Sequence, residues 1–130
     1  MKTLIKFTII LAITAFFATA AFSQTTRINF KKGATSAIVT GTMKGYKSVR
    51  NYVIRVREGQ TLNTEDIGIN HITLGIEGPP GSGYEQDMAA DCHAFNEISP
   101  TSKGDYKITV TECQKADLWK GSFKLKITVK

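Results

Sequence analysis

Three side chains that lie close together in the sequence, Asp87, Asp91 and His93, carry oxygen and nitrogen atoms of the kind that bind metal ions. If the chain around Cys92 is extended, Asp91 and His93 point to one face and Cys92 to the other. A protein metal site needs at least three converging ligands, and this cluster is short. The pattern therefore favours a polar face beside a cysteine, and we expect no metal site.

The rest of the chain contains no recognised catalytic pattern. Its two histidines, His71 and His93, lie in no known catalytic motif, and its acids are scattered among predicted turns. The glycine-rich segment 78–83 lacks the Lys-Ser/Thr pair of a phosphate-binding loop, and Pro79 and Pro80 lack backbone N–H groups. We therefore expect a loop at 78–83 and a protein without enzyme activity or cofactor.

The two cysteines of the chain, Cys92 and Cys113, are expected to pair. An exported protein meets an oxidising environment, where a disulfide forms and persists. This bridge would close a loop of about 22 residues and stabilise the fold by about 3 kcal/mol through loop-closure entropy. The alternative is a pair of buried free thiols.

The N-terminal segment has the features of a cleavable secretion signal. Lys2 and Lys6 precede an apolar run over residues 7–22, and Ala21-Phe22-Ser23 is a small-x-small cleavage site before Gln24. A membrane anchor is the alternative, but no stop-transfer cluster of charges follows the run. We expect residues 1–23 to be removed and residues 24–130 to be exported as one domain, to the periplasm or outside the cell, without a membrane segment.

The basic excess of the chain is spread out. The net charge is +6, and removal of Lys2 and Lys6 would leave +4. The lysines and arginines occur singly on alternating positions, without interleaved aromatic residues, which is typical of a solvated face rather than a nucleic-acid surface.

Period-two alternation of apolar and polar residues predicts several strands. The alternating segments are 27–31, 51–57, 71–76, 106–111 and 123–130, and the last is the clearest. Turn signals such as Glu58-Gly59 and Lys103-Gly104 separate them, and the segments 87–95 and 114–119 stay ambiguous between helical turns and loops. Short strands with frequent turns predict an all-β fold, an antiparallel sandwich or barrel.

Four stretches of the mature chain together resemble the periplasmic inhibitors of goose-type lysozyme. They are INFKKGATSA (28–37) leading into GTMKGY (41–46), YVIRVREGQ (52–60), GDYKITV (104–110) and the closing strand 123–130. That family is itself similar to inhibitors of invertebrate-type lysozyme and to pre-peptidase C-terminal-like β-sandwich domains. The resemblance implies a sandwich of about eight antiparallel strands that binds the active-site cleft of a lysozyme through loops at one end.

The resemblance also implies three loops as contacts with the lysozyme, and we expect them to converge at one end of the sandwich. Their tips are the segments 44–50, 102–105 and 114–120. A lysine gains a charge-assisted hydrogen bond from a cleft carboxylate, and an aromatic ring gives contact area. Tyr106 is also in phase with Ile108 and Val110, as a core residue would be, and Trp119 also fits a cap on the core. The candidate contacts are Lys44, Tyr46, Ser102, Lys103, Tyr106, Lys115, Trp119 and Lys120.

One turn departs from the pattern of the inhibitor family, and the net charge gives the inhibitor interpretation no support. The family turn reads Ser-Gly-x-Tyr, whereas here Lys103 holds the serine position and Ser102 precedes it. Lysozymes are usually basic, so a chain of charge +4 must rely on local contacts rather than on net charge. The alternatives to an inhibitor are a non-catalytic module that binds glycan or peptidoglycan, and an accessory domain without a lysozyme partner. A monomer or a dimer fits the sequence.

Overall fold

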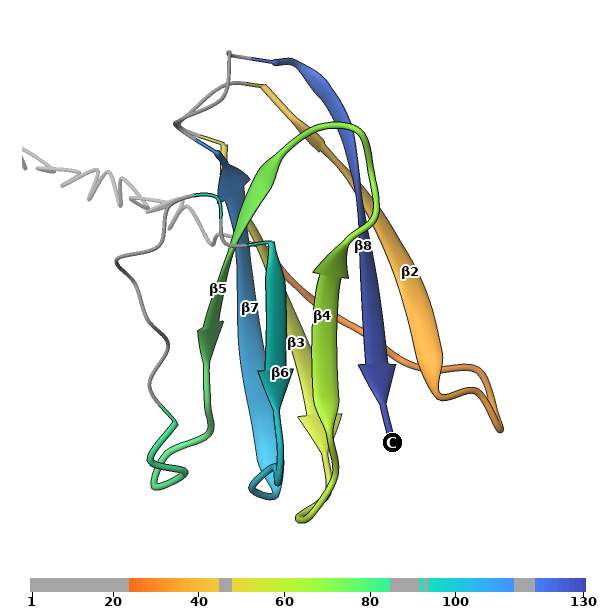
Figure 1. Ribbon diagram of the computed structural model, residues 1–130, viewed down its shortest axis with the longest axis vertical. Helices are drawn as coiled ribbons and strands as arrows, with labels where there is room; N and C mark the ends of the chain where they lie inside the picture. Colours follow the sequence, from red (N-terminus) through yellow and green to blue (C-terminus); the bar gives the residue numbers. More distant parts are fainter. Residues whose placement is uncertain (1–23, 45–47, 85–91, 93, 114–118) are drawn as a thin grey trace, which may run out of the picture.

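The computed structural model describes residues 24–44, 48–84, 92, 94–113 and 119–130, which form two sheets packed face to face (Figure 1). The first sheet has the order β1 (Thr25–Arg27), β3 (Arg50–Val56), β7 (Gly104–Glu112), β5 (Ile72–Glu77). The second has the order β2 (Ser36–Met43), β8 (Gly121–Val129), β4 (Leu62–Asp66), β6 (Phe95–Ile98). Nowhere in the described ranges does a helix form that is long and apolar enough to cross a membrane.

Burial in the structure follows the alternation of apolar and polar residues in the sequence. In β7, Tyr106, Ile108 and Val110 are buried, and the residues between them are at least partly exposed. In β8, Phe123, Leu125 and Ile127 face inward, and Lys124 and Lys126 face solvent. Because side chains alternate between the faces of a strand, each sheet contributes one apolar face to a shared core.

The core between the sheets contains an aromatic contact and a hydrogen-bonded pair of buried polar residues. The rings of Tyr52 and Phe123 meet edge to face with centroids 6.4 Å apart, next to Gly41. On the second sheet, Asn96 donates a hydrogen bond of 3.3 Å to Thr64, and both residues are buried. The bond offsets the desolvation of two polar side chains in the interior.

The sandwich expected from the resemblance is confirmed, with eight strands, and the barrel alternative is excluded. The predicted strands 51–57, 71–76, 106–111 and 123–130 correspond to β3, β5, β7 and β8. The predicted strand 27–31 is wrong, because β1 ends at Arg27. Its alternation instead places buried Ile28 and half-buried Phe30 against the core from a segment outside the sheets.

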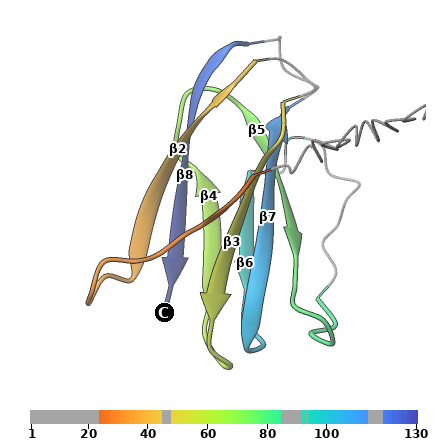
Figure 2. The same cartoon turned by 180° about the vertical axis from the view of Figure 1, so that it is seen from behind.

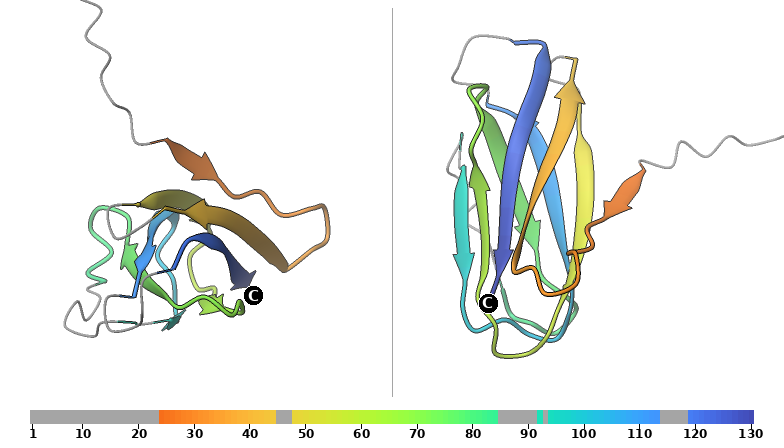
Figure 3. Two further views of the ribbon diagram at one scale, coloured as in Figure 1. Left: turned by 90° about the horizontal axis from the view of Figure 1, so that it is seen from above. Right: turned by 90° about the vertical axis from the view of Figure 1, so that its right-hand side faces the viewer.

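The strands pair antiparallel except at one edge, where β1 runs parallel to β3. Figures 2 and 3 show why: the orange segment after β1 crosses to the other sheet and enters β2 from the far end. Strand β2 then runs back, so that β3 takes the direction of β1 again. The expectation of a purely antiparallel fold therefore fails at β1 alone.

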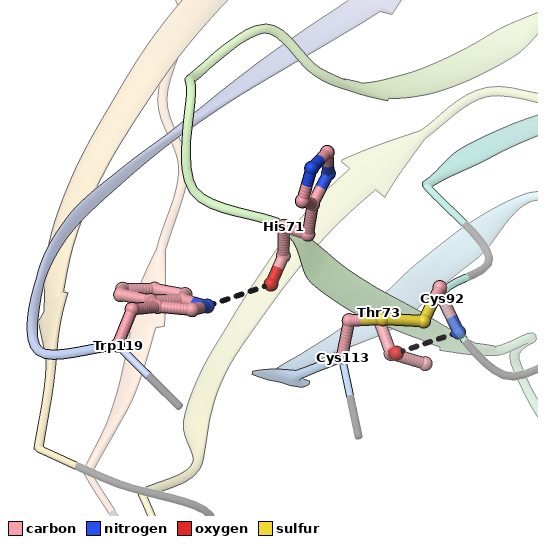
Figure 4. The surroundings of a disulfide bond; sticks show 5 residues. All are labelled: His71, Thr73, Cys92, Cys113 and Trp119. Atoms are coloured by element: carbon pink, nitrogen blue, oxygen red, sulfur yellow. Dashed lines mark hydrogen bonds between the residues drawn. A yellow bond between two sulfur atoms is a disulfide. The ribbon is translucent and has the colours of Figure 1, made fainter. Parts of the chain in front are cut away.

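The predicted disulfide is present, and free thiols are excluded. Cys92 and Cys113 are joined with their Cα atoms 4.6 Å apart. The bridge ties the end of β7 to the segment that precedes β6, and the N–H of Cys92 donates a hydrogen bond of 3.0 Å to the hydroxyl of Thr73 on β5 (Figure 4). One covalent bond thus joins an inner strand of the first sheet to the approach to an edge strand of the second.

Candidate functional site: the two ends of the sandwich

The strand directions define two ends of the molecule. At the upper end in Figure 1, strands β2, β4 and β7 finish and strands β3, β5, β6 and β8 begin. At the lower end the reverse holds. Strand β7 alone has nine residues, which at about 3.3 Å per residue separates the two ends by about 30 Å.

The structure divides the three predicted contact loops between these ends. Lys44 follows β2, and Trp119 and Lys120 precede β8, so these residues lie at the upper end. Ser102 and Lys103 precede β7 and lie at the lower end. The register explains the division, because Arg50 pairs with Val110 whereas Val56 pairs with Gly104. The expectation that all three loops converge at one end is therefore wrong.

Trp119 is anchored at the upper end rather than projecting freely. Its ring is half-buried against the core, and its indole N–H donates a hydrogen bond of 3.0 Å to the backbone carbonyl of His71 (Figure 4). The backbone N–H of Cys113 donates to the same carbonyl at 3.2 Å. This oxygen therefore ties Trp119, which precedes β8, to the cysteine that follows β7. Beside Trp119, the Lys120 side chain is exposed.

The loop between β4 and β5 adds an apolar tip to the upper end, which our reading of the sequence missed. Ile69 is 93% exposed. The loop around it is held by hydrogen bonds, from the Gly68 N–H to the Asp66 carboxylate at 3.0 Å and from the Asn70 amide to the Ser122 carbonyl at 2.7 Å. The Asp-Ile-Gly-Ile-Asn sequence could have indicated a turn that displays an isoleucine.

The turn before β7 holds its tyrosine inside the molecule. The Tyr106 side chain is 1% exposed, and its hydroxyl accepts a hydrogen bond of 3.0 Å from the backbone N–H of Ser102. The prediction that Tyr106 binds a partner is therefore wrong. The core position suggested by its phase with Ile108 is confirmed. Lys103, at the tip of the same turn, is exposed.

Some predicted residues lie outside the described part of the chain. They are Tyr46 and Lys115 among the contacts, and Asp87, Asp91 and His93 of the polar cluster. Within the described ranges, no three His, Cys, Asp or Glu side chains come close enough to hold a metal ion.

The outer face of the first sheet carries one ion pair. The Arg27 guanidinium on β1 donates two hydrogen bonds of 3.0 Å to the Asp105 carboxylate on β7. This contact lowers the pKa of Asp105 below its usual range and raises the pKa of Arg27. Both side chains are exposed to solvent, so the pair orients β1 more than it stabilises the fold.

Solved structures with the same fold include inhibitors of lysozyme. The structure is similar to PliG from Aeromonas hydrophila, a periplasmic lysozyme inhibitor of g-type lysozyme, with a TM-score of 0.59 and 19% identity over 82% of this chain and 96% of that one. It is also similar to PliG from Salmonella Typhimurium, with a TM-score of 0.58 and 20% identity over 82% of this chain and 98% of that one.

A different kind of protein shares the fold as well. The pre-peptidase C-terminal domain of a collagenase from Bacillus anthracis matches with a TM-score of 0.50 and 13% identity, over 83% of this chain and 96% of that one. No protein-family model matches the chain, and no curated protein matches it. At these identities the comparisons show the fold, as the resemblance in the sequence implied.

Proposed function

We propose that this chain, exported after removal of residues 1–23, binds and inhibits a lysozyme of the goose type. The observation that carries the proposal is the shared fold, since solved g-type lysozyme inhibitors match this chain over nearly their whole length. The disulfide supports action in the periplasm or outside the cell, because such bonds persist in oxidising compartments. The chain acts as a monomer or dimer, without catalysis, cofactor, metal or nucleic acid.

The upper end of the sandwich is the surface that we assign to the lysozyme. It gathers two of the three predicted contact loops, with exposed Lys44 and Lys120 for acidic groups of a sugar-binding cleft. Exposed Val49 and Ile69 add apolar contact area beside them. Tyr46 and Lys115, which lie outside the described residues, stay proposed contacts because the resemblance implies them.

The hydrogen-bonded anchors at this end favour binding to a rigid cleft. The β4–β5 loop and Trp119 are held by bonds to backbone carbonyls of Ser122 and His71. A loop and a side chain that are already held in place lose less conformational entropy on binding. Ser102 and Lys103 form a separate candidate surface at the lower end, too far away to enter the same cleft as the upper loops.

The test is lysis of a peptidoglycan suspension, followed by turbidity, with lysozymes of the goose, invertebrate and chicken types. We expect stoichiometric inhibition of the goose-type enzyme by the purified exported protein. If none of the three enzymes is inhibited, the proposal fails and the alternative becomes a module that binds glycan or peptidoglycan. A pull-down with insoluble peptidoglycan in the absence of enzyme then tests that alternative directly.

Two charge-reversal variants locate the surface in the same assay. Lys120→Glu at the upper end should weaken inhibition about tenfold or more, because it opposes the cleft carboxylates. Lys103→Glu changes the same charge at the lower end and should leave inhibition within about twofold. The reverse result would move the binding surface to the turn before β7.

A further inference from the structure

A groove runs along the lower half of β3, between this strand and the segment that follows β1. Figure 2 shows that segment, in orange, running obliquely from the edge of the first sheet to the start of β2. The groove has a volume of about 560 Å³. Buried Ile28, Ile54 and Val56 contribute its apolar lining, with Phe30 and Val129 beside them.

The edge of the first sheet is open at this groove. Strand β1 pairs with β3 from Asn51 to Val53, and the N–H of Ile28 donates the last bond, of 2.9 Å, to the Val53 carbonyl. Because the backbone groups of alternate residues point to the same edge, those of Arg55 come next along it. In the described ranges, no backbone hydrogen bond joins Arg55 to the segment after β1.

The open stretch is short and is closed below Arg55. The next backbone N–H at this edge belongs to Arg57, which donates a hydrogen bond of 2.7 Å to the side chain of Gln60. A guest strand would therefore find room beside Arg55, between a paired residue above and a capped residue below. Unpaired backbone groups at a sheet edge are where a strand can add, and Arg55 offers one N–H and one C=O of this kind.

The charges around the groove have one sign. Arg55, Arg57 and Lys103 line it, all exposed, and no acidic residue lines it. Arg27 also lines it but is paired with Asp105, the sole ion pair among the described residues. Arg55 lies across from Asp105 in the register and helps to lower the pKa of that carboxyl group. Arg57 and Lys103 form no ion pair with another described residue. Cations of this kind attract an anionic partner and raise its rate of association.

We propose that this groove binds an extended acidic peptide segment of a partner protein, which adds to the free edge of β3. Backbone pairing at Arg55 would hold the segment, its carboxylates would meet Arg55, Arg57 and Lys103, and its apolar side chains would enter the groove. A glycan or another polyanion has no peptide backbone to pair with the strand. The groove lies away from the upper end, so this inference does not depend on lysozyme binding.

The test is fluorescence anisotropy of the full chain with a short fluorescein-labelled peptide of alternating Glu and Val, in low salt. We expect binding to the native protein and a loss of affinity of about tenfold in the double variant Arg55→Gln, Arg57→Gln. The matched control is Lys124→Gln, Lys126→Gln, which removes the same charge from the outer face of β8 and should change affinity less than about twofold. If thermal unfolding shows that the Arg55→Gln, Arg57→Gln variant has a folding defect, Lys103→Gln alone replaces it. We expect this single variant to weaken binding as well.

Two further probes separate strand addition from a general attraction to anions. Two versions of the peptide, N-methylated on every Glu or on every Val, each lack the N–H groups of one edge, and we expect one of them to lose binding. Equal binding of both versions, or of short inorganic polyphosphate in place of the peptide, would overturn the proposal in favour of a general anionic surface. Equal losses in the two double variants, or no binding of the Glu-Val peptide to the native protein, would overturn it as well.

Discussion

The apolar side chain of Ile69 contributes little to folding, so its presence at a loop tip points to a role in binding. An isoleucine that is 93% exposed at a loop tip buries almost no apolar surface within the chain. We therefore expect Ile69→Ser to weaken lysozyme inhibition about tenfold while the free energy of unfolding stays within about 0.5 kcal/mol of the native value. Inhibition titrations and chemical denaturation measure the two quantities.

The control for this substitution is Ile38→Ser. Ile38 is 63% exposed on the outward face of β2, away from the upper end. Its replacement removes the same side chain from a surface that we assign to no partner, and inhibition should be unchanged. Equal losses in both variants, or none in either, would mean that the β4–β5 loop makes no contact with the lysozyme.

Gly41 sets the distance at which the two sheets meet. A Cβ atom at this position would lie 2.6 Å from two ring atoms of Phe123 and 2.9 Å from the Tyr52 hydroxyl. Because both rings are buried, we expect Gly41→Ala to reduce the free energy of unfolding by about 1–3 kcal/mol. Thr40→Ala, at the exposed neighbouring position, should change it by less than about 0.5 kcal/mol. Urea denaturation of both variants is the measurement.

At the scale of the strand, the sequence predicts an element where its inward residues are large and apolar. Strands β3, β5, β7 and β8 have this pattern. Strand β2 lacks this pattern, because Gly41 faces the core and Ile38 faces solvent. Strands β4 and β6 follow it only at the pair of Leu62 and Ile98. At the other inward pair, buried Thr64 and Asn96 face each other. Polar residues paired with each other inside a core leave no periodic signal in a single sequence.

The disulfide is the covalent link between elements, and its removal has a defined expected cost. We expect the double variant Cys92→Ala, Cys113→Ala to unfold with a free energy about 3 kcal/mol lower, since the bridge limits the freedom of the unfolded chain. Inhibition per folded molecule should be nearly intact, because the hydrogen bond from Trp119 to the His71 carbonyl stays in place. Thermal unfolding with and without reductant checks this, and an unchanged melting temperature would contradict it.

At the scale of the whole molecule, the sequence suggested candidate contact loops but not how they are arranged in the fold. The contact role of Lys44, Trp119 and Lys120 came from the resemblance, and it stays a prediction. Which end each loop occupies depends on how the strands alternate between two sheets, which spacing along the chain does not reveal. The turn at Ser102 therefore separates from the other two loops only when β7 is placed beside β3.

The dependence of stability on pH also belongs to the whole fold, and two tyrosines contribute to it on the alkaline side. Burial raises the pKa of Tyr52 and of Tyr84 above the usual value of 10.0, most of all by desolvating the phenolate. A raised folded-state pKa means that the unfolded chain loses these protons first, so the stability they contribute is full below about pH 10 and is lost as pH rises further. We therefore expect Tyr52→Phe to lose less stability than the native protein between about pH 9 and 11. Urea denaturation of both proteins at the two pH values measures the difference in stability loss. Comparing the two proteins also removes the effect of lysine titration, which they share. Parallel losses in the two proteins would show that the Tyr52 hydroxyl titrates as freely in the folded state as in the unfolded one.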